Sequence, residues 1–235
     1  MFIAEADGLA AIAETGTLRV PQPITHGTVG GQSYLLLENI ELSSHGNAQQ
    51  FGEQLAALHR CTGKAFGFKQ DNFIGTTAQP NGWKENWIDF WREWRLGFQL
   101  RLAAENGYAS QLQSLGEKLL LALPAFFEDY TPIPSLLHGD LWSGNHAYLA
   151  DGTPIVFDPA TYYGDRECDI AMTELFGGFA ANFYTAYRTA WPLDGGYETR
   201  RDLYNLYHIL NHANLFGGGY IRQAEQMMRK LLNTR

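Results

Sequence analysis

Residues 138–145 read His-Gly-Asp-Leu-Trp-Ser-Gly-Asn, and residues 155–158 read Ile-Val-Phe-Asp. The two segments supply two carboxylates and one amide in the order that Mg²⁺-dependent phosphoryl transfer to a hydroxyl requires. In that chemistry the first Asp accepts the proton of the acceptor hydroxyl, and the Asn and the later Asp bind Mg²⁺. The pattern therefore predicts Asp140 as the general base and Asn145 with Asp158 as a metal-binding pair.

The residues around the motif predict short strands that bring these side chains together. Residues 147–150 and 154–157 are strand-like, and Asp151-Gly152 between them is a strong hairpin signal. A hairpin there folds Asp158 back beside the loop that carries Asp140. We therefore expect one site to hold all three side chains.

Two other interpretations of the motif compete with phosphoryl transfer. A lone Asp before an apolar run is usually a turn or cap residue. His138 and His146, close to Asp140 in the sequence, also fit a metallohydrolase, because imidazole and carboxylate ligands suit Zn²⁺ or Mn²⁺. The metallohydrolase leaves Asn145 and Asp158 without a role, so phosphoryl transfer is favoured.

Composition limits the class of protein and its partners. With 235 residues, 45% of them hydrophobic, the chain can bury a substantial core as one large domain or two lobes. A formal net charge of −8 argues against nucleic acid or an anionic membrane as the main partner. Cys61 and Cys168 lack the spacing of a metal knuckle and fit reduced thiols. Glu5 and Asp7 interrupt the apolar opening, which argues against a signal peptide or membrane span and favours a cytoplasmic protein.

The first third of the chain predicts a helix, a strand and a second helix. Residues 2–14 are Ala-rich with a modest apolar face, and residues 33–37 fit a strand. Residues 20–24 are too proline-rich for a central strand. Residues 27–31, Gly-Thr-Val-Gly-Gly, resemble a phosphate loop, but they lead into a strand and lack a Gly-Lys-Ser/Thr ending, so a turn is favoured. Asn47 and Gln50 form a capping-box pattern before an apolar helix.

The remaining pattern is mostly helical. Apolar residues recur at steps of three or four from Trp83 to Leu102, which predicts one helix with an aromatic stripe. Such a stripe is more often core than a ligand site. Further helices are predicted over 112–123, over 203–210 and after the break at 217–219.

The residues after the motif carry a resemblance to a known family. Residues 157–160 read Phe-Asp-Pro-Ala, residues 162–167 read Tyr-Tyr-Gly-Asp-Arg-Glu, and residues 169–172 and 176–179 read Asp-Ile-Ala-Met and Phe-Gly-Gly-Phe. Together with residues 138–145 they resemble the fructosamine kinase family, which is similar to aminoglycoside phosphotransferases and choline kinases. The resemblance runs over most of the chain, and the segment 162–167 is its specific part.

The resemblance implies an α+β fold of the protein-kinase-like, two-lobed kind, with a mostly helical large lobe. It implies ATP- and Mg²⁺-dependent phosphorylation of a sugar hydroxyl on fructosamine or ribulosamine adducts of amines. Those adducts include free ketosamines and glycated protein lysines. We expect residues 1–40 to form part of the small lobe with the hinge, and residues 41–235 to form the large lobe.

The resemblance also assigns residues to roles. Asp140 becomes the base, Asn145 and Asp158 the Mg²⁺ ligands, and Glu5 the helix carboxylate that pairs with a strand lysine. The segment between the lobes, whose backbone would meet adenine, comprises Leu37, Glu38, Asn39 and Ile40.

On the acceptor side, Trp142 is predicted to stack on the sugar, with simple packing as the alternative. Arg166 and Glu167 are predicted either to contact substrate or to pair with each other. His138 is expected to brace the loop by hydrogen bonding, and Asp169 to bind the loop backbone.

The small lobe departs from the family pattern. Four residues precede Glu5, none of them Lys, and Lys64 is the first lysine in the chain. The glycine-rich strand-turn-strand that covers the phosphates is also missing. A charged hydrogen bond of that kind contributes about 1.5–3 kcal/mol, or roughly ten- to a hundredfold in phosphate binding or turnover. The sequence therefore predicts a truncated small lobe, either in a shortened form of a kinase or in a degenerate relative.

Three functions follow from these patterns. The first is a ketosamine kinase with attenuated activity, the second a non-catalytic ketosamine-binding protein, and the third a kinase for an aminoglycoside, choline or another small alcohol.

Overall fold

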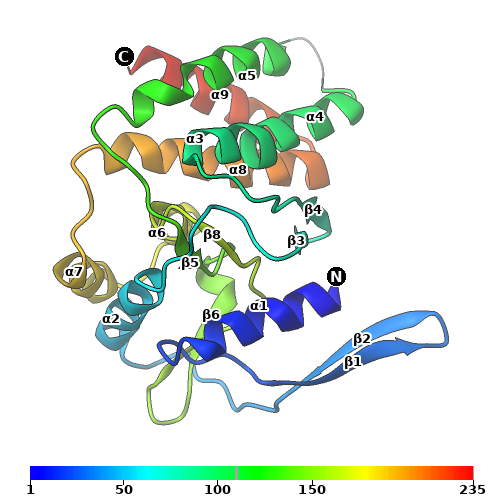
Figure 1. Ribbon diagram of the computed structural model, residues 1–235, viewed down its shortest axis with the longest axis vertical. Coiled ribbons are helices and arrows are strands. Elements are labelled where there is room, and N and C mark those ends of the chain that lie inside the picture. The colour runs from blue at the N-terminus through cyan, green and yellow to red at the C-terminus, as the bar shows by residue number, and fades with distance from the viewer. Residues whose placement is uncertain (109–110, 235) are drawn as a thin grey trace.

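The structure, a computed structural model, describes residues 1–108 and 111–234. Helices are its most abundant elements, and its strands pair in four two-stranded antiparallel sheets within these residues. Figure 1 shows the amino-terminal helix and hairpin at one end and the long helices at the other, with the short strands between them.

The amino-terminal part consists of helix α1 (Phe2–Glu14) and the hairpin of β1 (Pro23–Val29) and β2 (Gln32–Leu37). α1 has the predicted bounds and buries Leu9 and Ile12. The hairpin extends away from the body (Figure 1), and most of its residues are exposed. The helix is thus the part of this region that packs next to the middle of the molecule.

One prediction for this region needed correction in detail. The strand expected at 33–37 is confirmed as β2, but the turn predicted over 27–31 is shorter. Residues 27–29 belong to β1, and only Gly30 and Gly31 form the turn. β1 begins at Pro23, where a proline costs no ladder hydrogen bond because it stands at the first position of an edge strand.

Helix α2 (Ala48–His59) begins at the predicted cap, since Oδ1 of Asn47 accepts the amide of Gln50 at 3.0 Å. The reciprocal half of the predicted capping box is wrong, because the amide of Asn47 donates to the Gly152 carbonyl. This bond ties the start of α2 to the turn of the hairpin near the site. α2 packs along α7 (Ala181–Ala190).

The helix predicted over 83–102 is divided. α3 (Trp87–Phe90) begins after the cap Asn86, a π-helical segment (Trp91–Leu96) follows, and α4 (Gly97–Glu105) completes it. Trp83 lies outside the helix and is half-exposed, whereas Trp87 and Trp91 are buried, as expected for a core stripe. Arg95, four positions after Trp91 in the π segment, is also buried, although the apolar pattern does not single out a charged residue.

The remaining helices form the body. α5 (Gln111–Ala122) passes into a 3₁₀ turn (Leu123–Phe126) at Pro124, close to the predicted end. The predicted helix near 203–210 is the centre of α8 (Tyr197–Phe216), and α9 (Gly219–Asn233) follows the glycine break. α8 packs on α6 (Glu167–Leu175) and on α9, which also packs on α5.

Short strands in the middle carry the motif residues. β5 (Ser135–Leu137) pairs with β8 (Tyr162–Gly164), and the predicted hairpin is confirmed as β6 (His146–Tyr148) with β7 (Pro154–Val156). A third pair, β3 (Asn72–Ile74) and β4 (Thr77–Gln79), lies beside them. None of the helices in the described ranges is long and apolar enough to cross a membrane.

Candidate active site

The loop between β5 and β6 brings the predicted triad together. Nδ2 of Asn145 donates to the backbone carbonyl of Asp140 at 2.9 Å, to its carboxylate at 3.3 Å, and to the carbonyl of Asp158 at 3.5 Å. Asp158 has a φ of 57°, a left-handed conformation that is uncommon for a residue other than glycine and recurs at functional sites. The predicted convergence of the three residues is confirmed, while their chemical roles stay predictions.

Asp140 has the electrostatic environment of a proton acceptor. Burial, with the nearby carboxylates of Asp158 and Asp169, raises its pKa to about 7, against the smaller lowering by the Asn145 hydrogen bond. A carboxylate with a pKa near the working pH can take a proton readily in the transition state and release it afterwards. The geometry thus suits Asp140 to general-base catalysis.

Asn145 and Asp158 also fit a divalent cation. The amide nitrogen of Asn145 is committed to Asp140 and Asp158, so its oxygen is the atom that remains for a ligand. Asp158 is exposed, and its carboxylate takes no hydrogen bond from the residues that the structure describes. Carboxylate and amide oxygens beside a cavity are the ligands that Mg²⁺ prefers.

A buried aspartate braces the loop, as predicted. Asp169 on α6 accepts the amide of His138 at 2.8 Å and the amide of Gly139 at 2.9 Å, one with each carboxylate oxygen. Nε2 of His138 lies 3.0 Å from the carbonyl of Phe157, and its Nδ1 accepts the amide of Asp140. Burial lowers the pKa of His138, so the ring is neutral and serves as a brace. The sequence did not single out His59, whose Nε2 lies 3.1 Å from Asp169.

Two cavities meet at the carboxylates. The first, of about 390 Å³, contains Trp142 and Asn145, and the second, of about 370 Å³, contains Glu5. Both are lined by Asp140, Asp158 and Gly75. A group held in one cavity can therefore reach a group held in the other at the two carboxylates.

The β3–β4 hairpin forms the wall shared by both cavities. Nδ2 of Asn72 donates to the Thr161 carbonyl at 2.8 Å, and Nε2 of Gln79 donates to the Ala160 carbonyl at 3.0 Å. Gln79 also accepts the hydroxyl of Tyr207 at 2.8 Å. These buried bonds fix the hairpin to the segment that follows Asp158.

The larger cavity contains polar residues of α8 that sequence reasoning missed. They are His208, Asn211 and His212, and with Leu215 they follow the steps i, i+3, i+4 and i+7 of one helix face. The spacing of these residues is visible in the sequence, but the apolar stripe of Leu203, Leu206 and Leu210 on the same helix is the stronger pattern. Burial lowers the pKa of His208 to about 3, so its ring is neutral at pH 7.

Trp142 lies at the larger cavity. Its side chain lines the larger cavity and is partly exposed, and its ring covers Gly144, where a β-carbon would approach it to 2.2 Å. The contact with Gly144 is packing, and the face toward the cavity is available to a ligand. Its role in binding stays a prediction.

The predicted nucleotide residues lie on the amino-terminal side. Glu5 lines the smaller cavity, and burial together with the Asp158 charge raises its pKa. No lysine or arginine in the described ranges forms an ion pair with Glu5. Leu37 ends β2, and the segment continues through Asn39 and Ile40. The Glu38 carboxylate pairs with Arg19 and accepts the Gln22 amide at 3.1 Å, so its side chain is used in structure.

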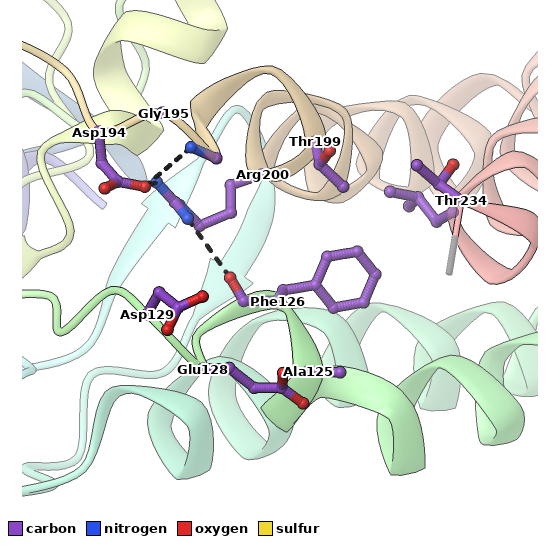
Figure 2. A pocket seen from close by; sticks show the side chains of 11 residues that line it. Ala125, Phe126, Glu128, Asp129, Asp194, Gly195, Thr199, Arg200 and Thr234 are labelled. Carbon is purple, nitrogen blue, oxygen red and sulfur yellow. Dashed lines mark hydrogen bonds and ion pairs between the residues drawn. The ribbon is translucent and has the colours of Figure 1, made fainter.

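Arg166 and Glu167 do not reach either cavity. Glu167 is buried and pairs with Arg200 at 2.7 Å, which overturns the alternative that the two motif residues pair with each other. Figure 2 shows Arg200 between Asp194 and Phe126. Arg200 donates to the Asp194 carboxylate at 2.6 Å and to the Phe126 carbonyl at 3.4 Å. Arg166 donates to the hydroxyl of Tyr187 at 3.1 Å. Arg166 thus binds α7, and Glu167 binds α8. Neither residue lines either cavity.

The metallohydrolase alternative has no support in the described residues, which contain no group of three His, Cys, Asp or Glu side chains that could hold a metal ion. The ring of His146 packs against Phe51 and Phe179, and that of His138 braces the loop. The two imidazoles therefore serve in packing and hydrogen bonding, and they do not form a shared metal site.

Comparison with known proteins supports the resemblance found in the sequence. A family model described as fructosamine kinase matches residues 1–234. A probable ketoamine kinase of Synechocystis sp. is 52% identical over 235 residues, which cover 99% of this chain and 79% of that protein. A chloroplastic protein-ribulosamine 3-kinase of Arabidopsis thaliana is 47% identical over 228 residues, covering 95% and 70% of the two chains.

The fold agrees as well. A crystal structure of a candidate fructosamine-3-kinase from Haemophilus somnus has a TM-score of 0.90 and 35% identity, covering 99% of this chain and 80% of the other. The expected α+β, protein-kinase-like fold is thus confirmed, and it extends with lower similarity to choline kinase-like enzymes. The division at residue 40 stays a prediction.

Proposed function

Because the chain belongs to the fructosamine kinase family, we propose that it transfers the terminal phosphoryl group of ATP to a sugar hydroxyl of a ketosamine. The observation that carries this proposal is the position of Asp140 and Asp158, which line both cavities. A phosphoryl donor and an acceptor need such a junction, because the reacting oxygen and phosphorus must meet in line.

We assign the proton transfer to Asp140. As the acceptor oxygen forms its bond to phosphorus, its proton passes to the Asp140 carboxylate, and the bond from phosphorus to the leaving nucleoside diphosphate breaks. Asn145 holds the base in place through its 3.3 Å hydrogen bond, and Asp169 fixes the loop backbone. The raised pKa of Asp140 favours this role.

Asn145 and Asp158 would hold Mg²⁺, which when bound neutralises phosphate charge as the leaving group departs. The exposed carboxylate of Asp158 and the amide oxygen of Asn145 fit such an ion. The segment from Leu37 to Ile40 is proposed to meet adenine through its backbone, with the Glu38 side chain engaged elsewhere.

The larger cavity is proposed to take the ketosamine. Trp142, Phe176 and Tyr220 offer ring faces to a sugar and to the ammonium of its amine, while His208 and Asn211 offer hydrogen bonds to hydroxyls. The half-exposed ring of Trp142 and the exposed ring of Phe216 line the same cavity. Because exposed residues line this cavity, the amine substituent of a bound ketosamine could extend into solvent. A glycated lysine side chain could then enter the cavity while the rest of its protein stays outside.

The proposal is tested with MgATP and synthetic fructosyl-lysine or ribulosyl-lysine derivatives. We expect a phosphorylated ketosamine and its loss in Asp140→Asn, by a factor of roughly 10² to 10⁴. Asp151→Asn, an exposed turn position, is the matched control and should retain activity.

Each other outcome points to a different function. Binding of the ketosamine without turnover at high MgATP would replace the kinase with a non-catalytic binding protein. A preference for choline or an aminoglycoside would assign a small-alcohol kinase. An active Asp140→Asn variant would remove Asp140 as the base.

A further inference from the structure

Arg166 belongs to the segment 162–167, which carries the specific part of the family resemblance, but it lies away from both cavities. It is buried, and Nη1 donates to the hydroxyl of Tyr187 on α7 at 3.1 Å. Its guanidinium also donates to two carbonyls of the loop after α7 and lies over the ring of Trp191 at 4.1 Å. The hydroxyl of Tyr187 lies 2.8 Å from Nδ1 of His59, whose Nε2 lies 3.1 Å from the Asp169 carboxylate. A continuous chain of buried groups thus runs from Arg166 to the catalytic loop.

The donors and acceptors of this chain have one arrangement that satisfies every group. A guanidinium only donates, so the oxygen of Tyr187 accepts from Arg166. Burial raises the pKa of Tyr187 above its usual value, so the hydroxyl keeps its proton, and His59 Nδ1 is in reach to accept it. The ring proton of His59 then lies on Nε2, facing Asp169. Any other assignment leaves the Tyr187 proton without an acceptor beside a buried cation.

We infer that Arg166 and Tyr187 are positioning residues for the catalytic loop. Arg166 holds the Tyr187 hydroxyl, which fixes Nδ1 of the His59 ring, and Nε2 of His59 in turn fixes the Asp169 carboxylate. Each oxygen of that carboxylate then stays on one loop amide, that of His138 or that of Gly139. The inference rests on the proposed function in one respect, namely that the loop around Asp140 is catalytic.

The chemistry of an arginine explains the residue at this position. The planar guanidinium donates in three directions at once, to a hydroxyl and to two carbonyls, while its face packs on an indole. A lysine keeps the charge but lacks the planar fork. Arg166 therefore links the loop after α7 to the chain of groups that ends at the loop amides.

The first test compares Tyr187→Phe with Tyr197→Phe. Both tyrosines are buried and each loses one hydroxyl, but that of Tyr197 donates to Glu174 at 3.0 Å, away from the loop. Amide hydrogen exchange is measured at His138 and Gly139 in the full chain without substrates. We expect exchange roughly tenfold faster in Tyr187→Phe and unchanged in Tyr197→Phe. Equal exchange in the two variants would overturn the inference.

Steady-state kinetics gives a second readout that a purely structural role would not produce. With folded protein, Tyr187→Phe should lower kcat roughly three- to tenfold and leave the KM of ATP and of the ketosamine unchanged. A rise in KM with kcat unchanged would contradict a positioning role. If the wild type shows no turnover, the proposed function fails, whereas the exchange result still decides this inference.

The pair Arg166→Lys and Arg166→Met keeps the test decisive if Tyr187→Phe folds poorly. Loop exchange should be faster in both variants, because lysine lacks the fork. Where Tyr187→Phe does fold, combining it with Arg166→Met should add little. Wild-type loop exchange in Arg166→Lys, or fully additive effects in the double variant, would show that the two residues act independently and would sink the inference.

Discussion

Gly139 lies directly against Ala160, so that a β-carbon on Gly139 would be 2.1 Å from the Ala160 carbonyl oxygen. The amide of Ala160 donates to the carbonyl of His138 at 2.9 Å, on the other side of the same contact. The loop that carries Asp140 and the segment that follows Asp158 are thus joined backbone to backbone. Only glycine permits this approach, since it also needs a φ of 86°.

Gly139→Ala should inactivate the protein and destabilise it more than a change in φ alone explains. Gly152→Ala is the matched control, because Gly152 has a φ of 85° but its nearest neighbour to a β-carbon lies at 3.7 Å. The control should lose about 1–2 kcal/mol of unfolding free energy and keep its kcat. Urea unfolding and kcat measure both effects. Equal losses in the two variants would contradict the backbone contact.

Local signals explain what the sequence could predict. The hairpin around Asp151-Gly152, the bounds of α1 and the cap at Asn47 each depend on neighbouring residues, and all three are confirmed. The hairpin alone brings Asn145 and Asp158 beside Asp140, without any knowledge of distant contacts. The position of Trp142 at a cavity follows from the same loop.

Distant partners explain what the sequence could not predict. The partner of Glu167 is Arg200, 33 positions away, and no local pattern encodes such a pair. Arg95 is buried in the helix that follows Trp87, and its partners are the Pro80 carbonyl and the Asn81 side chain outside that helix. His208 belongs to a second stripe on a helix that is buried nearly all round, where one hydrophobic face hides another.

Glu167→Gln should reduce stability without changing the KM of the acceptor. The Glu167 carboxylate is fully buried against Arg200, and the variant leaves that cation with Asp194 as its remaining carboxylate. We expect a loss of about 2–3 kcal/mol in the free energy of unfolding, measured in urea. Glu198→Gln, which removes an exposed pair with Arg201, should change it by less than about 1 kcal/mol. If Glu167→Gln instead raises the KM of the acceptor and keeps wild-type stability, Glu167 contacts the substrate.

Trp142→Phe should raise the KM of the ketosamine several-fold and leave the KM of ATP unchanged. The smaller ring offers less stacking area to a sugar, whereas packing on Gly144 needs only an aromatic edge. Trp83→Phe, another half-exposed tryptophan outside both cavities, is the control and should match the wild type. Unchanged acceptor KM in Trp142→Phe would mean that packing is the only role of this ring.

His208→Asn should make the protein less sensitive to acid. Burial lowers the pKa of His208 to about 3, with a further lowering by His212 and Arg95 and an opposing effect of Asp169. In the unfolded chain a histidine takes a proton near pH 6.5, while the folded state excludes it. Above pH 6.5 the ring is neutral in both states, so His208 does not reduce the free energy of unfolding. As the pH drops from 6.5 toward 3, only the unfolded chain gains the proton, and the free energy of unfolding falls.

The size of that effect can be measured by urea unfolding at pH 7 and pH 5. The His208 contribution to the loss between these values is about 2 kcal/mol, and it should be absent in His208→Asn. The buried His138 acts in the same direction but is present in both proteins, so it cancels in the comparison. His45→Asn, at an exposed position, should keep the full acid sensitivity. If His208→Asn loses as much stability on acidification as the wild type, the His208 ring accepts a proton in the folded state and is not the neutral hydrogen-bonding group of the acceptor cavity.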